Sequence, residues 1–168
     1  MRVLLPALLL LCACVKAPPT PPVEPPLALE LARHPDGTTW KLSEERGRVV
    51  LLDVWATWCE ACRDSLPLYQ QLVKKHAAQG VVMYALNIDG APSVPDIGPF
   101  LSDAKVTAPV LRDEDARVSE SLLKVSMLPS AVLIDRQGRL RHHHQGFENG
   151  SIETVERQLV NLLAEPVP

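Results

Sequence analysis

The sequence predicts an α/β fold in which helices flank a central mixed β-sheet. Two apolar runs, 49–55 and 81–88, have the length and near-continuous hydrophobicity of strands that are buried on both faces. A helical pattern over 59–78 separates them, with Cys59 and Cys62 at its start. The 168 residues, 46% hydrophobic and 22% charged, suffice for one domain and an appendage.

The elements around these runs follow from turn chemistry and periodicity. Strands over 27–32 and 38–42 are expected to form a hairpin around His34-Pro35-Asp36-Gly37. Pro67 lies inside the first helix and is expected to kink it. The remaining predicted elements are a short helix over 97–104, a strand over 109–111, a helix over 113–124, strands over 131–135 and 139–144 joined by a turn at 136–138, and a helix that Ser151 caps and that ends near Leu163.

The N-terminus has the composition of an export signal. Arg2 precedes the apolar stretch 3–11, which is too short to span a bilayer. The following Leu11-Cys12-Ala13-Cys14 resembles a bacterial lipobox, which predicts removal of residues 1–13 and lipidation of Cys14. An ordinary cleaved signal and an uncleaved apolar anchor are the alternatives.

Residues 14–26 are expected to tether the domain to a membrane. Six of the nine residues 18–26 are proline, so this stretch favours a semi-rigid polyproline II spacer of about 3.1 Å per residue. A partner-binding motif is the alternative. The globular domain then comprises 27–168 and lies outside the cytoplasm, where disulfides persist.

The spacing of Cys59 and Cys62 is suited to reversible dithiol–disulfide exchange. At the start of a helix, it places both sulfur atoms on one side of the first turn. The free N–H groups and the dipole there favour a thiolate and lower the pKa of Cys59 below about 8.5. Cys62 is close enough to close a disulfide with Cys59.

Several motifs together resemble the thioredoxin superfamily, in particular its membrane-tethered TlpA/ResA-like branch. The resemblance covers about residues 27–165. It rests on the segment 49–59 with its Trp-Cys-x-x-Cys, on Pro67 eight residues after Cys59, and on Met127-Leu128-Pro129-Ser130 before Ile134-Asp135 and Gly138. A thioredoxin-like fold with an N-terminal β-hairpin and the TlpA/ResA-type insertion at 89–112 is therefore expected.

The resemblance implies roles for the two cysteines. Cys59, exposed at the helix tip, would attack a substrate disulfide, and the more buried Cys62 would resolve the mixed disulfide. A static disulfide or half of a zinc site is the alternative, although a second Cys-x-x-Cys or His-x-x-His is absent from the sequence.

Asp53 interrupts the apolar run that precedes the cysteines. A charge in such a strand costs several kcal/mol (roughly) unless it is used or neutralised. Thioredoxins carry a buried carboxylate at this position, whereas many TlpA/ResA-like members carry Asn. We therefore expect Asp53 to have a raised pKa and to serve Cys62 as a base; a partly solvated, hydrogen-bonded carboxylate is the alternative.

Further residues are assigned to the site by the resemblance. Pro129 is expected to be cis and to expose the backbone of Leu128 for an extended substrate, with Trp58 beside it; an ordinary trans turn is the alternative. Glu60 and Ala61 stand where thioredoxin has Gly and Pro. The charge of Glu60 disfavours the Cys59 thiolate, which would make the pair a better electron donor.

The sequence thus predicts a monomeric, lipid-anchored periplasmic thiol–disulfide oxidoreductase without metal or organic cofactor. By resemblance it would reduce exported proteins, such as apocytochromes c at their haem-site cysteines, with electrons from a membrane donor of the DsbD/CcdA type. A net charge of -3 without a basic tract argues against nucleic-acid binding.

Two other protein classes share parts of this pattern. A Sco-like copper chaperone would need Cys-x-x-x-Cys, and a peroxiredoxin would need Pro-x-x-x-Thr/Ser-x-x-Cys, whereas Thr57 lies only two residues before Cys59. His142 and His144 could share one face of a strand, with His143 opposite, but two histidines are not a closed metal site. They are expected to be surface residues on an edge strand.

Overall fold

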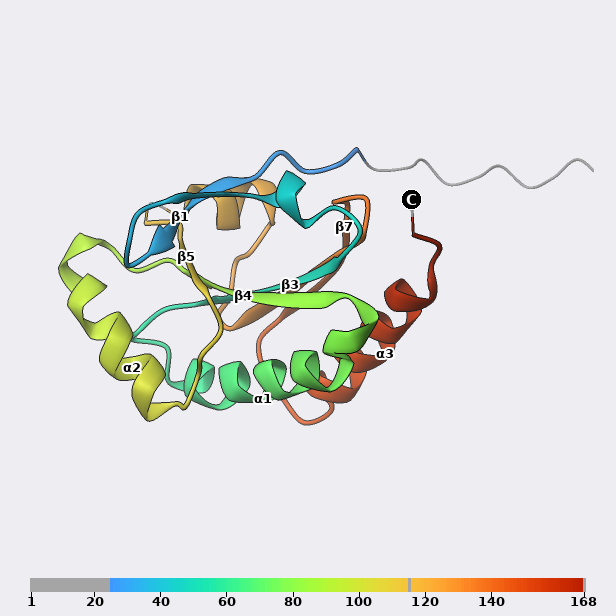
Figure 1. Cartoon of the computed structure of the whole chain (residues 1–168). Helices are drawn as coiled ribbons and strands as arrows, with labels where there is room; N and C mark the ends of the chain where they lie inside the picture. Colours follow the sequence, from blue (N-terminus) through green and yellow to red (C-terminus); the bar gives the residue numbers. More distant parts are fainter. Residues whose placement is uncertain (1–24, 115, 168) are drawn as a thin grey trace, which may run out of the picture.

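A seven-stranded mixed sheet forms the centre of the domain (Figure 1). The computed structural model describes residues 25–114 and 116–167, and its strands are ordered β2-β1-β5-β4-β3-β6-β7. The strands are β1 (Glu30–His34), β2 (Thr39–Lys41), β3 (Val49–Trp55), β4 (Val81–Asn87), β5 (Val110–Arg112), β6 (Ser130–Ile134) and β7 (Leu140–Gln145); the α-helices are α1 (Glu60–His76), α2 (Ile97–Asp103) and α3 (Ser151–Ala164).

The strand directions confirm the predicted mixed sheet and place β3 at its centre. β3 runs parallel to β4 and antiparallel to β6, while β4 is parallel to β5. The hairpin of β1 and β2 joins through β1, which is antiparallel to β5. All seven residues of β3 are buried, as its continuous apolar sequence predicts.

Each face of the central strands β3 and β4 is covered by a different set of elements, and the hairpin at the edge of the same sheet supplies one of them. Figure 1 shows α1 and α3 along one face, and the hairpin of β1 and β2 over the other. Alternate residues of β3 divide between the two cores, so that Leu51 and Trp55 pack toward the helices and Leu52 and Val54 toward the hairpin. The helix-side core also contains Cys59 and Cys62.

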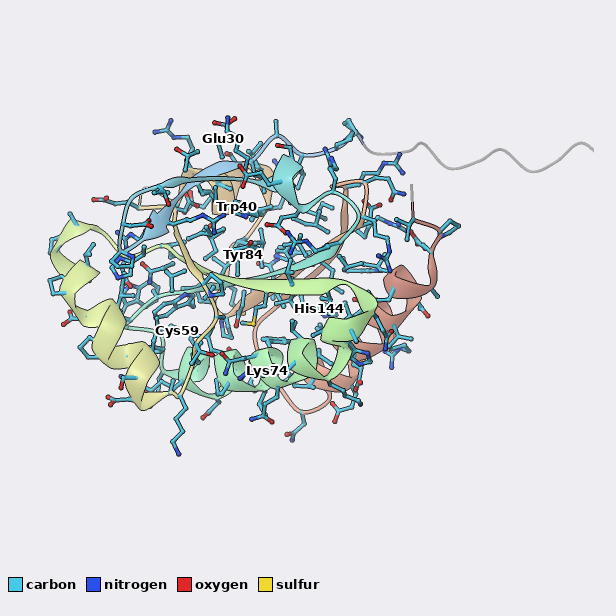
Figure 2. The ribbon with its side chains drawn as sticks, in the orientation of Figure 1. Glu30, Trp40, Cys59, Lys74, Tyr84 and His144 are labelled. Atoms are coloured by element: carbon cyan, nitrogen blue, oxygen red, sulfur yellow. A yellow bond between two sulfur atoms is a disulfide. The ribbon has the colours of Figure 1, made fainter. Side chains whose placement is uncertain are left out.

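A buried carboxylate ties the hairpin side together. Glu45 accepts hydrogen bonds from the indole Nε1 of Trp40 at 3.1 Å and from the hydroxyl of Tyr84 at 2.6 Å, and it pairs with Arg48. Trp40 and Tyr84 lie on the opposite side of β4 from Lys74 of α1 (Figure 2). These bonds satisfy polar groups that would be costly to bury alone.

The prediction of a helix over 113–124 is wrong. This segment forms only a five-residue helical turn, η4 (Val118–Leu122). The carboxylate of Asp113 accepts the backbone N–H groups of Val118 and Ser119, and Ala116 has a positive φ of 52°. A left-handed residue cannot continue a right-handed helix, so a full helix cannot form here.

Smaller differences occur at the ends of other elements. Helix α3 begins at Ser151 but is capped by Gly150 at φ 90°, while the Ser151 hydroxyl accepts the N–H of Glu148; the predicted Ser151 cap is therefore wrong. Strand β1 begins at Glu30, three residues later than expected, and α1 continues through Pro67.

The predicted signal, the lipidation site Cys14 and most of the tether lie outside the described residues. Within 25–114 and 116–167, no helix is long and apolar enough to cross a membrane.

The central strand makes a direct stability prediction. Replacing Leu51, which is fully buried, with Ala should lower the free energy of unfolding by about 2–5 kcal/mol, because it removes apolar contacts and leaves a cavity. Urea denaturation of Leu51→Ala measures this loss. Val160→Ala, at a position 41% exposed on α3, is the control and should change stability by about 0.5 kcal/mol or less. Equal effects would contradict the assigned core.

Candidate active site

Cys59 and Cys62 are joined as a disulfide at the N-terminus of α1. Cys59 is the N-cap residue of the helix, with φ -88° and ψ 101°, and Cys62 lies in the first turn. Their Cα atoms are 5.3 Å apart. This confirms the predicted placement of the pair between β3 and α1, and it shows the oxidised state of the dithiol.

The pair is less exposed than the sequence suggested. Cys59 is 7% exposed and Cys62 is fully buried, so the relative order is as predicted but the exposed tip is not. The neighbouring Trp58, by contrast, is 69% exposed. Cys59 is therefore reached through a pocket rather than from a protruding turn.

That pocket has a volume of about 620 Å³ and combines residues from distant parts of the chain. Trp58, Cys59, Glu60 and Ala61 come from the start of α1 and the residue before its cap. The other walls are largely apolar and come from the end of β4 and from two segments that precede β6. These residues are Ile88, Ala116, Ser119, Glu120, Val125, Ser126, Met127 and Leu128.

The loop before β6 presents unpaired backbone groups beside the pocket. The Leu128–Pro129 peptide bond is cis, which confirms the prediction. Among the described residues, neither the N–H nor the C=O of Leu128 has a hydrogen-bond partner. The Pro129 carbonyl accepts the N–H of Gly146 at 2.8 Å, and the Ser130 hydroxyl donates to the Met127 carbonyl at 2.7 Å. The loop is thus held in place while Leu128 stays free to pair with an extended chain.

Asp53 is a fully buried carboxylic acid on the helix side of β3. It lies between Ala85 of β4 and Ala131 of β6, and neither of its oxygen atoms has a hydrogen-bond partner among the described residues. Burial raises its pKa well above the usual value, because the charged form loses its hydration. The full burial is against the partly solvated alternative, while the role of Asp53 as a base stays a prediction.

Tyr69 of α1 faces the same core and is electrostatically coupled to Asp53. Burial and the nearby Asp53 carboxylate both raise the pKa of the Tyr69 hydroxyl. Tyr69 is not among the site residues predicted from the sequence. Its coupling to Asp53 joins two segments that no local pattern could relate.

Glu60 and Ala61 occupy the open side of the disulfide. The Glu60 side chain is 93% exposed, and its carboxylate lies 3.6 Å from Nε of Arg63. The Arg63 guanidinium in turn stacks over the Phe100 ring at 4.3 Å. Water screens an exposed carboxylate, so the influence of Glu60 on Cys59 is weaker than its sequence position alone suggests.

Sequence reasoning missed a buried polar cluster around Thr57, the residue that precedes Trp58 in the chain. Asp89, 1% exposed, accepts hydrogen bonds from the N–H and the hydroxyl of Thr57 at 2.9 and 3.1 Å. Asn87 and Arg112 complete the cluster. The one available signal was an Asp directly after the apolar run 81–88, at the end of the sheet that carries the cysteines.

The histidines of β7 alternate as predicted. His142 and His144 pair with Leu133 and Ala131, and His143 pairs with Val132, so His143 faces the other side of the sheet. All three are partly buried rather than freely exposed, and burial lowers the pKa of His142 and His143. In the described part of the chain, no three His, Cys, Asp or Glu side chains are grouped to hold a metal ion.

Comparison with known proteins identifies the family to which the chain belongs. The family model described as AhpC/TSA matches residues 25–143, which is more than half of the chain. The chain belongs to the AhpC/TSA family. Its fold is thioredoxin-like, as the sequence predicted.

Several proteins that are similar to this chain are named for thiol–disulfide exchange. The chain is 31% identical over 117 residues to the thiol-disulfide oxidoreductase ResA of Oceanobacillus iheyensis, covering 70% of this chain and 59% of the relative. It is 30% identical over 126 residues to the ResA of Geobacillus kaustophilus, covering 75% and 70%. A solved structure from Chlorobium tepidum, named as a thiol:disulfide interchange protein DsbE, superposes with a TM-score of 0.74 at 31% identity over 84% of this chain and 96% of that one.

The buried carboxyl makes stability depend on pH. Because its pKa is raised in the folded state, the folded protein binds more protons than the unfolded chain above about pH 4, and stability falls as the pH rises toward the folded pKa. Asp53→Asn lacks this titration. The unfolding free energy of the variant relative to the parent should therefore grow by up to about 1.4 kcal/mol per pH unit in that window. Urea titrations between pH 4 and 8 measure it; a constant difference would contradict the raised pKa.

Proposed function

We propose that this protein is a thiol–disulfide oxidoreductase whose reactive group is the Cys59–Cys62 dithiol. The observation that carries the proposal is the position of the disulfide. It caps a helix at the floor of an apolar pocket, with the unpaired backbone of Leu128 on the pocket wall. A structural disulfide needs neither of these features. The names of the related proteins agree with this activity.

The reaction uses two thiol–disulfide exchanges. In the reduced protein the Cys59 thiolate attacks one sulfur of a substrate disulfide, whose S–S bond breaks and whose other sulfur leaves as a thiolate. Cys62 then attacks Cys59 Sγ and releases the second substrate sulfur. The substrate gains two electrons and becomes a dithiol, and the protein is left with the Cys59–Cys62 disulfide seen here.

The start of α1 activates Cys59, and the pocket binds the substrate. Free N–H groups in the first turn of α1 stabilise negative charge on Cys59. An extended substrate pairs with the free N–H and C=O of Leu128, and apolar side chains fill the pocket beside Trp58 and Met127.

The Asp53 carboxylate accepts the proton that Cys62 loses as Cys62 attacks Cys59 Sγ. Cys62 belongs to the helix-side core, and Asp53 lies on the same face of β3 as Leu51 and Trp55 of that core. Both side chains are fully buried, so bulk water does not reach the Cys62 thiol. An acid whose pKa is raised toward that of a thiol transfers a proton with a smaller free-energy difference than an ordinary carboxylate.

The proposed physiological role is that of a reductant outside the cytoplasm. Although water screens its exposed carboxylate, Glu60 still disfavours the thiolate of the reduced form, which favours electron donation. Lipidation at Cys14, the proline-rich tether over 14–26, supply of electrons by a DsbD/CcdA-type membrane protein and action on exported thiols, including those of apocytochromes c, complete the proposal.

Single cysteine replacements test the order of attack. Cys62→Ser should retain a nucleophile and accumulate a covalent mixed disulfide with a peptide disulfide, because the resolving thiol is gone. Cys59→Ser should form no such adduct, since Cys62 is fully buried. Non-reducing mass spectrometry after incubation with intact insulin, whose chains are joined by disulfides, distinguishes the two. Adducts on Cys62 rather than Cys59 would reverse the assigned roles.

The proton-transfer role of Asp53 predicts a kinetic effect. Asp53→Asn should reduce insulin more slowly near neutral pH, by about a hundredfold or more, because general acid–base assistance is lost while the fold is kept. The matched control is Asp135→Asn, a buried carboxylate in the turn after β6. Rates of Asp53→Asn equal to those of the parent across pH 6 to 9 would refute the role.

A further inference from the structure

The backbone ladder between β3 and β4 is continued by a side chain. The last paired residues are Trp55 and Asn87, and the Ile88 N–H then donates to the Trp55 carbonyl at 3.0 Å. Beyond this point the chains separate. The Asp89 carboxylate takes over, with Oδ2 accepting the Thr57 N–H at 2.9 Å and Oδ1 accepting the Thr57 hydroxyl at 3.1 Å.

Asp89 is held rigidly by its own surroundings. The Asn87 side-chain amide donates to Oδ2 at 2.6 Å and its carbonyl oxygen accepts the Asp89 N–H at 3.2 Å. Arg112 donates to the Asn87 carbonyl oxygen and, at 2.7 Å, to the Asp89 backbone carbonyl. A buried carboxylate is tolerated when it is hydrogen-bonded, and the bonds from Thr57 and Asn87 meet this condition.

The residue that Asp89 fixes belongs to the loop that carries the attacking cysteine. Thr57 lies two residues before Cys59, and the Cys59 N–H donates to the Ala56 carbonyl at 3.1 Å. Trp58, between Thr57 and Cys59, lines the pocket. The direction in which both residues face the pocket therefore depends on the anchored backbone of Thr57.

The same cluster anchors the opposite wall of the pocket. The Asp113 backbone N–H donates to the backbone carbonyl of Asn87 at 2.9 Å. The Asp113 carboxylate accepts both the N–H and the hydroxyl of Ser119 at 2.7 Å, and Ser119 lines the pocket. The two pocket walls come from different segments of the chain, and both are hydrogen-bonded to residues at the end of β4.

We propose that Asp89 is a positioning residue for disulfide exchange at Cys59, which rests on the function proposed above. It sets the reacting geometry through Thr57, with its carboxylate bonded to Thr57 and Asn87 and to neither cysteine. Its shape and hydrogen-bonding capacity carry this role, and its charge does not.

Two substitutions at Asp89 separate position from charge. Asp89→Ala removes every side-chain bond to Thr57. Asp89→Asn keeps an oxygen for the Thr57 N–H and supplies an amide that can donate to the Thr57 hydroxyl, so it removes only the charge. Asp135→Ala is the matched control, because Asp135 is equally buried and accepts the N–H groups of Gln137 and Arg139 at the opposite end of the sheet.

The experiment measures exchange of the reduced full-length chain with oxidised glutathione, and kcat and KM with insulin. Asp89→Ala should slow exchange by about tenfold to hundredfold and should lower kcat more than it raises KM, because the reacting sulfur is misplaced. Asp89→Asn should stay within about twofold of the parent, because the bonds to Thr57 are kept. Asp135→Ala should also stay within about twofold, because Asp135 is bonded to Gln137 and Arg139 and not to the loop that carries Cys59. The pH profile of Cys59 alkylation by iodoacetamide should keep its midpoint in Asp89→Asn.

The other outcomes of these measurements can be told apart. Parental rates in Asp89→Ala would remove the positioning role and leave the proposed function intact. Equal losses in Asp89→Ala and Asp89→Asn, with a shifted alkylation midpoint, would assign the effect to charge. If Asp89→Ala does not fold, Thr57→Val decides, since it loses only the hydroxyl bond: slower exchange supports positioning, and an unchanged rate refutes it. A parent chain that exchanges with neither probe refutes the proposed function itself.

Discussion

The burial of β3 on both faces is the constraint on which the rest of the structure depends. A strand with no exposed residue must have a strand on each edge and a layer on each face. Helices α1 and α3 supply one layer and the hairpin of β1 and β2 supplies the other (Figure 1). Because β3 ends directly before α1, the same burial places the helix start, and with it Cys59, at the end of the sheet.

The site combines apolar surroundings with a few polar groups that each have a defined use. Asp53 lies in the dry core without a hydrogen-bond partner in the described structure, and burial raises its pKa well above the usual value. Asp89 is as deeply buried but fully bonded, which suits a structural support. Two carboxylates of similar burial therefore differ in whether hydrogen bonds stabilise their charged form.

Much of this arrangement could be predicted from local sequence. The strands β3 and β4 and the helix α1 follow from apolar runs and periodicity, and the position of the cysteines follows from their place between them. The cis peptide before Pro129 came from family resemblance rather than from the residues themselves.

The features that escaped prediction depend on contacts between distant segments. Thr57 and Asp89 are 32 positions apart, and only the register of β3 with β4 brings them together. The segment 113–124 has a helical composition, but the Asp113 side chain captures the N–H groups that a longer helix would need. The low exposure of Cys59 likewise depends on pocket walls that come from two remote segments.

The reduction potential of the Cys59–Cys62 pair tests the central claim most directly. Equilibration of the full-length chain in glutathione and dithiothreitol buffers, with the redox state followed by thiol alkylation, gives the value. A reversible two-electron couple below about -220 mV is predicted for a reductant. A potential above about -150 mV would make the protein a disulfide donor and contradict the proposed direction, and the absence of a reversible couple would contradict the proposed activity.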